Sequence, residues 1–454
     1  MALQPNLTCY LRKISINNAR CFAAAAKPKE SAKATATGGS KASHNQYLIP
    51  AEELKSTTVK SVRVSTLENN KPLAKIAVYY KAGSRYETDE TLGVVHSLRI
   101  ASGLGTSGAT RFGIARTIES NGGILTCTAG REHIAYTIEA TRDKIVNLQQ
   151  ILIDLASKQI FKPWEVKETL PRLTAERVTL APEIRVLELL HKAAFRKGLG
   201  YSLYSPKNRV GKTSADDLDA FVKNNFVEAS VVGLGVAHEF AELIAKRLKV
   251  TPSGREIQPS KFYSHEIRKD LAGDLAYVAV ATQGAGFGNP KEVVASALAQ
   301  RALGVGARAK RGNTAGKLSS AISDGSTATG INLNYSDAGL LGVLVVGTSS
   351  TIGGATKKAV DTLRTANLSD ADVSRAKSLL RNDIAFALES DAELVDDIGL
   401  QSLFNGSVTS QDEIVKLIDS VSPADVNNLL KKGGGKLSLA AIGNISKLPY
   451  LDEL

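Results

Sequence analysis

Cysteine is scarce in this sequence, and its positions limit the chemistry of the chain. Only Cys9, Cys21 and Cys127 are present, and two of them fall in the first 22 residues. No intramolecular disulfide framework is then available to the rest of the chain, and no cysteine cluster or C-x-x-C-H segment could hold an iron–sulfur cluster or a heme. The composition indicates a reducing compartment and predicts no cofactor.

Aromatic residues and long apolar runs are also few. Aromatics make up 5% of the residues, so the formal net charge of +12 is not accompanied by the stacking side chains of a nucleic-acid surface. Half of that charge lies in residues 1–50, where seven bases face one acid, Glu30. The longest apolar run, 339–347, is well short of the ~18–20 residues that span a bilayer. Nucleic-acid binding is therefore disfavoured, and any membrane association is expected to be peripheral.

Residues 1–22 form a basic segment without acids. Leu7, Leu11 and Ile14 recur there at helical spacing. An amphipathic, arginine-containing and acid-poor N-terminus is typical of a mitochondrial transit peptide, and it lacks the apolar core of a secretory signal. The sequence predicts cleavage after Phe22; the alternative interpretation is a disordered basic tail.

The remainder of the chain contains an internal repeat. Residues 23–45, rich in alanine, lysine, serine and glycine, predict a flexible linker. Beyond it, 214–235 matches 422–443 at an offset of 208, and each copy predicts a serine-capped helix followed by an apolar strand. The predicted strand at 134–141 has a counterpart at 339–347. A repeat of about 200 residues indicates duplication of a whole domain rather than a solenoid.

The order of elements in the first copy predicts the fold class. Strands are expected at 60–68, 74–82, 124–129, 133–141 and near 231, and helices at 92–104, 113–120, 143–159, 164–178, 183–196 and after 214. This order predicts an α+β fold, with a mixed, mainly antiparallel sheet backed by helices in each of two homologous domains. The predicted boundaries are 46–250 for the N-terminal domain, 251–261 for an inter-domain linker and 262–454 for the C-terminal domain.

The segment 92–104 carries the functional interpretation. In it, His96 is followed by Arg99 at i+3 and Ile100 at i+4. On one helix, positions i and i+4 share a face, and H-x-x-E-H in that arrangement supplies two zinc ligands and a water-activating glutamate. This segment, together with 81–87 before it, resembles the pitrilysin-type metallopeptidases. The resemblance covers the chain from residue 46 onward, including the duplication.

The motif is degenerate in this sequence. Isoleucine has no lone pair to donate to a metal, and a guanidinium cannot act as a base. The third ligand of the family is a glutamate on a later helix. Alignment through 190–195 places Leu173 at that position, with Glu176 close but out of register. One ligand position of three is then retained, so the prediction is no metal, no catalytic residue, and a hydrogen-bonded His96 on the inner face of its helix.

Similarities in several short segments indicate which members of the family this sequence resembles. The His-x-x-Arg-hydrophobic form, 131–137, 204–212 and 334–337 resemble the inactive family members that serve as core subunits of ubiquinol–cytochrome c reductase, respiratory complex III. The resemblance implies a structural and assembly role at the matrix side of the mitochondrial inner membrane. It also implies a dimeric assembly with a second core subunit, cytochrome b, the c-type cytochrome and the Rieske subunit.

A second member of the family offers an alternative function. The non-catalytic subunit of the mitochondrial processing peptidase, which binds presequence peptides, has a glycine-rich substrate loop where this chain has the glycine-rich, basic stretch 304–317. That stretch predicts either a mobile surface loop or a contact with a peptide or a neighbouring subunit.

Overall fold

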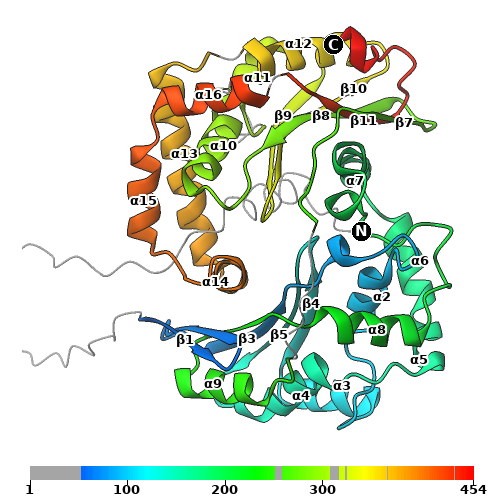
Figure 1. Cartoon of the computed structure of the whole chain (residues 1–454), viewed down its shortest axis with the longest axis vertical. Helices are drawn as coiled ribbons and strands as arrows, with labels where there is room; N and C mark the ends of the chain where they lie inside the picture. The colour runs from blue at the N-terminus through cyan, green and yellow to red at the C-terminus, as the bar shows by residue number, and fades with distance from the viewer. Residues whose placement is uncertain (1–52, 251–257, 307–315, 323–324, 366, 434) are drawn as a thin grey trace, which may run out of the picture.

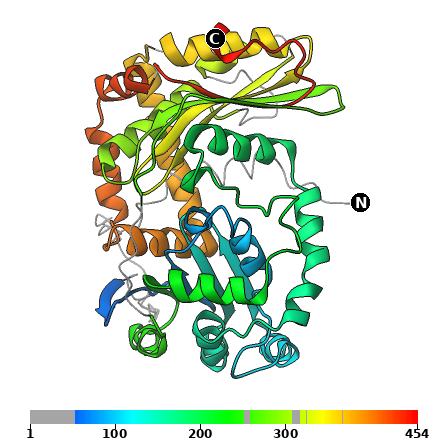
Figure 2. The ribbon, with the colours of Figure 1, turned by 45° about the vertical axis from the view of Figure 1, so that its right-hand side comes forward.

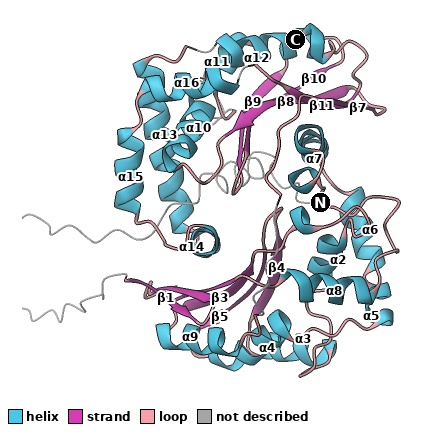
Figure 3. Cartoon of the chain, viewed as in Figure 1, coloured by secondary structure: helices cyan, strands magenta, loops and turns pink. Residues whose placement is uncertain are grey.

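The computed structural model describes residues 53–250, 258–306, 316–322, 325–365, 367–433 and 435–454. These residues form a six-stranded and a five-stranded sheet, each backed by helices, which Figure 1 shows one below the other and Figure 3 colours by element type. We call 53–250 the first half and 258–454 the second half. The predicted transit peptide and the linker at 23–45 lie outside the described residues, as does most of the predicted linker at 251–261.

The sheet of the first half has the order β1-β2-β6-β3-β5-β4 and is antiparallel except for the β2–β6 pair. Its strands are β1 (Leu54–Val59), β2 (Val62–Leu67), β3 (Leu73–Tyr80), β4 (Ile124–Ala129), β5 (Ile134–Thr141) and β6 (Ala229–Leu234). One face packs on helices whose apolar sides form a continuous core with it. These helices are α2 (Val94–Ile100), α3 (Arg111–Ser120), α4 (Ile145–Ser157), α5 (Pro163–Glu168), α8 (Ala215–Asn225) and α9 (His238–Arg247).

The second half repeats this plan. Its sheet has the order β7-β11-β8-β10-β9, with only the β7–β11 pair parallel. Its strands are β7 (Glu266–Asp270), β8 (Leu275–Gly284), β9 (Thr327–Asn334), β10 (Gly339–Thr348) and β11 (Ser438–Gly443). Its helices are α10 (Pro290–Leu303), α11 (Lys317–Ala321), α12 (Ile352–Thr365), α13 (Asp370–Glu389), α15 (Gln411–Ser420) and α16 (Pro423–Gly433). The predicted fold class, α+β with two mixed and mainly antiparallel sheets, is confirmed.

The two halves exchange one helix each. Helix α7 (Pro182–Phe195) of the first half packs on the second sheet, and α14 (Asp391–Phe404) of the second half packs on the first sheet (Figures 1 and 2). The two helices have equal length and begin 209 positions apart, close to the repeat offset of the sequence. Each sheet therefore has one face covered by its own half and the other face covered by the equivalent helix of the other half.

Both ends of α14 are held by the first half. At its start, Lys71 Nζ lies 2.6 Å from the carboxylate of Asp391. At its end, Arg63 donates hydrogen bonds of 2.8 Å to the carbonyl oxygens of Ser402 and Leu403, which the helix itself leaves unpaired. Cations at a helix C-terminus and anions at its N-terminus are the favourable arrangement. Polar contacts thus fix the position of α14 along the sheet.

Helix α14 lies close to the first sheet at Gly399. A Cβ added there would lie 2.3 Å from the ring of Tyr79 on β3, so Gly399→Ala should destabilise the chain by about 1–3 kcal/mol through overpacking. Gly354 on α12 is a matched control, because nothing lies within 4 Å of its added Cβ. Gly354→Ala should be neutral or stabilising by up to about 1 kcal/mol. Urea unfolding of the two variants provides the comparison, and equal effects would contradict the assigned packing.

The elements differ from their predicted positions in places. Strand β1 was not predicted, because four of its six side chains are exposed and no apolar alternation marks it. The helix predicted at 164–178 is two helices, α5 and α6 (Leu170–Val178), with Pro171 in the first turn of the second. Helix α2 is shorter than the predicted 92–104 and starts after Gly93, whose φ is 89°. The domain boundaries at 46–250 and 262–454 stay predictions.

No helix among the described residues has the length and apolarity needed to cross a membrane. The longest, α13, has 20 residues, and it carries acidic and basic side chains along its whole length.

Candidate functional site

Helix α2, which carries the degenerate motif, is anchored at its N-terminus by Glu87. The Glu87 carboxylate accepts hydrogen bonds from the backbone N–H groups of Gly93 (2.9 Å) and Val95 (2.8 Å), and the residue is only 6% exposed. Behind this turn, a Cβ at Gly93 would lie 2.4 Å from Ser205 Oγ, so the site requires glycine for space as well as for its positive φ. The start of α2 is therefore fixed on two sides.

Burial raises the pKa of Glu87 to about 7, although its two backbone hydrogen bonds oppose the rise. An acid whose pKa is higher in the folded than in the unfolded chain stabilises the folded chain. This contribution is complete when the pH is below the ordinary pKa near 4.5, and it is lost as the pH rises through 7. Relative to Glu87→Gln, the native chain should thus lose up to about 3 kcal/mol of unfolding free energy between pH 5 and 8. Urea unfolding at several pH values measures the difference, and a pH-independent difference would contradict it.

His96 lies buried between α2 and two other segments. Its Nδ1 accepts a hydrogen bond of 3.1 Å from the backbone N–H of Ser205, and its Nε2 lies 3.2 Å from Glu176 Oε2 on α6. The ring of Tyr204 contacts it edge-on at 5.4 Å between centroids. Because Nδ1 accepts, the neutral ring carries its proton on Nε2 and donates it to Glu176. Burial lowers the pKa of His96, and the charges of Arg99 and Arg172 lower it further.

Glu176 is the centre of the site. Arg99 Nη2 donates to Glu176 Oε2, the atom that His96 also contacts, and Arg172 Nε donates to Oε1 over 3.2 Å. Partial burial opposes ionisation of Glu176, but the hydrogen bond and charge of Arg99 prevail and lower its pKa. The carboxylate is therefore ionised and is shared by two guanidiniums.

Leu173, the predicted third-ligand position, is not the residue that lies beside His96. Glu176, not Leu173, faces His96 across the α2–α6 contact, and Leu173 is buried in the packing of α6 at 2% exposure. His96 thus has one carboxylate, that of Glu176, within hydrogen-bond distance of its Nε2. A signal for this was available in the sequence, because Glu176 is the only acid between Thr169 and Pro182. The contacts of Arg172, Tyr204 and Ser205 were not foreseen.

The residues present do not fit a zinc ion. Ile100, which shares the face of His96, is 3% exposed and offers no donor atom, and Arg99 places a guanidinium on the carboxylate that a metal would need. Within the described part of the chain, no group of three or more His, Cys, Asp or Glu side chains is placed to hold a metal. Arg99 thus supplies a permanent cation where the family places a dication.

The second half has a comparable ion pair at the equivalent place. Arg301 on α10 lies 3.0 Å from the carboxylate of Asp383 on α13, and its side chain is fully buried. Arg301 follows Arg99 by 202 positions, the spacing between the starts of β3 and β8. Asp383 follows Glu176 by 207 positions, the spacing between the starts of α4 and α12. An arginine–carboxylate pair between corresponding helices is therefore common to both halves.

Comparison with known proteins gives the family of the chain. The model of the insulinase family, peptidase family M16, matches residues 63–207. The mitochondrial cytochrome b-c1 complex subunit 2 of Rattus norvegicus is 36% identical over 86% of this chain and 90% of its own length. That of Homo sapiens is 35% identical over 86% and 89%. A probable mitochondrial-processing peptidase subunit alpha-1 of Arabidopsis thaliana is 26% identical over 89% and 85%.

A duplicated α+β fold with this helix motif defines the class, which is the M16 peptidases and their relatives. Within that class, the chain belongs to the family of the mitochondrial cytochrome b-c1 complex subunit 2, the core protein 2 family. The resemblance read from the degenerate motif is thereby confirmed.

Proposed function

We propose that the chain is a non-catalytic core subunit of ubiquinol–cytochrome c reductase, with a structural and assembly role on the matrix side of the mitochondrial inner membrane. Its partners are core protein 1, cytochrome b, the c-type cytochrome and the Rieske subunit, in a dimeric complex. The observation that carries the proposal is the identity of 36% to a cytochrome b-c1 complex subunit 2 over nearly the whole length of both chains.

The inactivity rests on the geometry around His96. A zinc peptidase needs three protein ligands and a base that activates water. At the ligand position, Ile100 has no lone pair, and at the base position Arg99 stays protonated at any working pH. Arg99 also occupies Glu176 by an ion pair. The chain accordingly supports electron transfer from ubiquinol to cytochrome c without performing chemistry of its own.

A second candidate function is the non-catalytic subunit of a mitochondrial processing peptidase, which would bind presequence peptides. The 26% identity to the probable alpha-1 subunit of such a peptidase favours it to a lesser degree. The glycine-rich stretch at 304–317, which suggested this alternative, falls largely outside the described residues, because 307–315 are not described.

Gentle solubilisation of mitochondria followed by native electrophoresis and mass spectrometry tests the proposal. We expect the chain to co-migrate with the heme of cytochrome b and with ubiquinol–cytochrome c reductase activity. A small heme-free heterodimer with processing activity would instead establish the second candidate. Zinc analysis of the purified chain tests the inactivity separately, because stoichiometric zinc would contradict it.

A further inference from the structure

Around the degenerate motif, positively charged side chains outnumber negatively charged ones. Arg99 and Arg172 share the single carboxylate of Glu176, and His96 beside them is neutral. A guanidinium carries five N–H donors, yet within the described residues each of these two has one hydrogen bond, to Glu176. The cluster therefore has a net charge of +1 and several free donors.

These donors are accessible. The side chain of Arg172 is 62% exposed and that of Arg99 is 23% exposed. Helix α2, which carries Arg99, packs against β4. Because β4 is the outermost strand of its sheet, the cluster lies at the rim of the first half.

The chain also has surface ion pairs that are balanced. Arg111 Nη1 lies 3.0 Å from Glu168 Oε2, and both side chains are more than half exposed. That pair has one cation for one anion and no neutral histidine beside it. The Arg99–Arg172 cluster differs from the Arg111–Glu168 pair because two cations converge on one anion. Two neighbouring guanidiniums that share one carboxylate favour a second, external anion with planar, bidentate geometry.

We propose that Arg99 and Arg172 form a binding site for an external carboxylate group, which lies beside Glu176 at the degenerate motif. The bound carboxylate accepts hydrogen bonds from the free guanidinium donors and completes a balanced set of two cations and two anions. Its source is either an acidic side chain of a peptide or a small dicarboxylate. The site goes beyond the proposed structural role, and its presence does not depend on that role.

Isothermal titration of the full-length chain tests the site with matched probes. The probes are succinate, its diamide, a capped Ala-Asp-Ala-Asp-Ala peptide and the corresponding asparagine peptide. We expect the carboxylate probes to bind and the amide probes not to bind. Arg172→Gln and Arg99→Gln should each weaken binding about five- to tenfold. Glu176→Gln should strengthen it by a similar factor, because it removes the competing internal carboxylate.

The control is Arg111→Gln, which removes an exposed arginine from a balanced pair and should leave binding unchanged. Equal weakening by Arg111→Gln and Arg172→Gln would overturn the proposal in favour of general attraction to a basic surface. Failure of Glu176→Gln to strengthen binding, or binding of the amide probes, would overturn it as well. Binding of the aspartate peptide alone would identify a protein partner as the source, and binding of succinate alone would identify a metabolite.

Discussion

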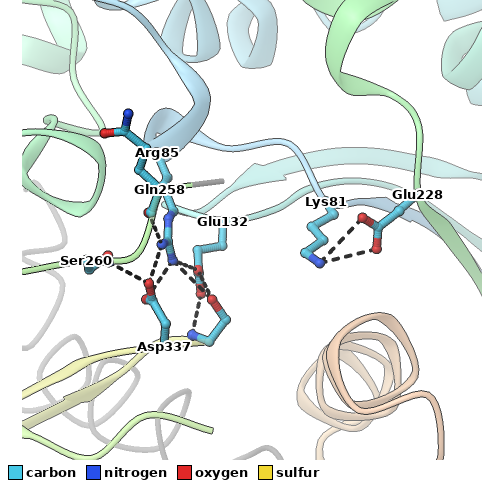
Figure 4. A network of polar contacts seen from close by, with 8 residues as sticks. Lys81, Arg85, Glu132, Glu228, Gln258, Ser260 and Asp337 are labelled. Atoms are coloured by element: carbon cyan, nitrogen blue, oxygen red, sulfur yellow. Dashed lines mark hydrogen bonds and ion pairs between the residues drawn. The ribbon is translucent and has the colours of Figure 1, made fainter. Parts of the chain in front are cut away.

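Replacing Arg85 with methionine is expected to lower the free energy of unfolding by about 3–5 kcal/mol. Figure 4 shows this guanidinium between the two halves. It lies 2.6 Å from Glu132 Oε1 of the first half and 2.5 Å from Asp337 Oδ2 of the second. It also donates to Ser336 Oγ (3.1 Å) and to the carbonyl of Gln258 (3.2 Å). One side chain thus connects two carboxylates and the segment that enters the second half.

The expected loss is large because the Glu132 carboxylate cannot be rehydrated in place, whereas Asp337 is 29% exposed. The side chains of Arg85 and Glu132 are each 4% exposed, so methionine would leave a buried anion without its cation. Adding Glu132→Gln to Arg85→Met should recover part of the loss, since the double variant no longer buries an unpaired charge.

Lys81 provides the matched control in the same region (Figure 4). Its ammonium lies 3.2 Å from Glu228, but the two side chains are 21% and 50% exposed. Lys81→Met should cost no more than about 1 kcal/mol. Urea unfolding monitored by circular dichroism compares the variants. If Arg85→Met and Lys81→Met cost the same, the Arg85 contacts do not stabilise the joint between the halves.

The double variant Arg99→Glu with Ile100→His is expected to bind about one zinc ion per chain. It would place two histidines at i and i+4 on α2, facing a carboxylate already 3.2 Å from His96 Nε2. Removal of the Arg99 guanidinium frees Oε2 of Glu176, while Arg172 stays paired with Oε1. Three ligands and a water-activating glutamate would then stand where the family has them.

Metal analysis after gel filtration measures this result. Arg99→Glu alone should retain no zinc, because Ile100 still occupies a ligand position. Adding Glu176→Ala to the double variant should abolish retention. If the double variant retains no zinc although it folds, the assignment of Glu176 as the third position is wrong.

Much of the fold was predictable because the internal repeat can be recognised in the sequence itself. Strands such as β8 and β10 have apolar side chains on both faces, since helices cover both sides of each sheet. The sequence did not show that the second face of each sheet is covered by a helix from the other half. No local pattern in Pro182–Phe195 or Asp391–Phe404 tells which sheet each helix contacts, because a buried apolar face fits either one.

The sequence predicted the type of site, but it did not predict which residue of α6 lies beside His96. The identities at His96, Arg99 and Ile100 were enough to predict a degenerate motif. The third position was assigned by an alignment through 190–195, which placed Leu173 there and Glu176 out of register. An alignment along the sequence does not tell which side chains of α6 face α2, and in the structure Glu176 is the one beside His96.

The exchanged helices also constrain the order in which the chain can fold during synthesis. The first sheet is complete in sequence at Leu234, but α14 begins 157 positions later. Until that helix has been synthesised, apolar side chains such as Ala77, Val232 and Leu234 on the uncovered face have no permanent partner. Such long-range contacts form slowly and leave aggregation-prone surface exposed meanwhile. The nascent first half should accordingly be a substrate for chaperones, and truncation before residue 391 should yield an insoluble product.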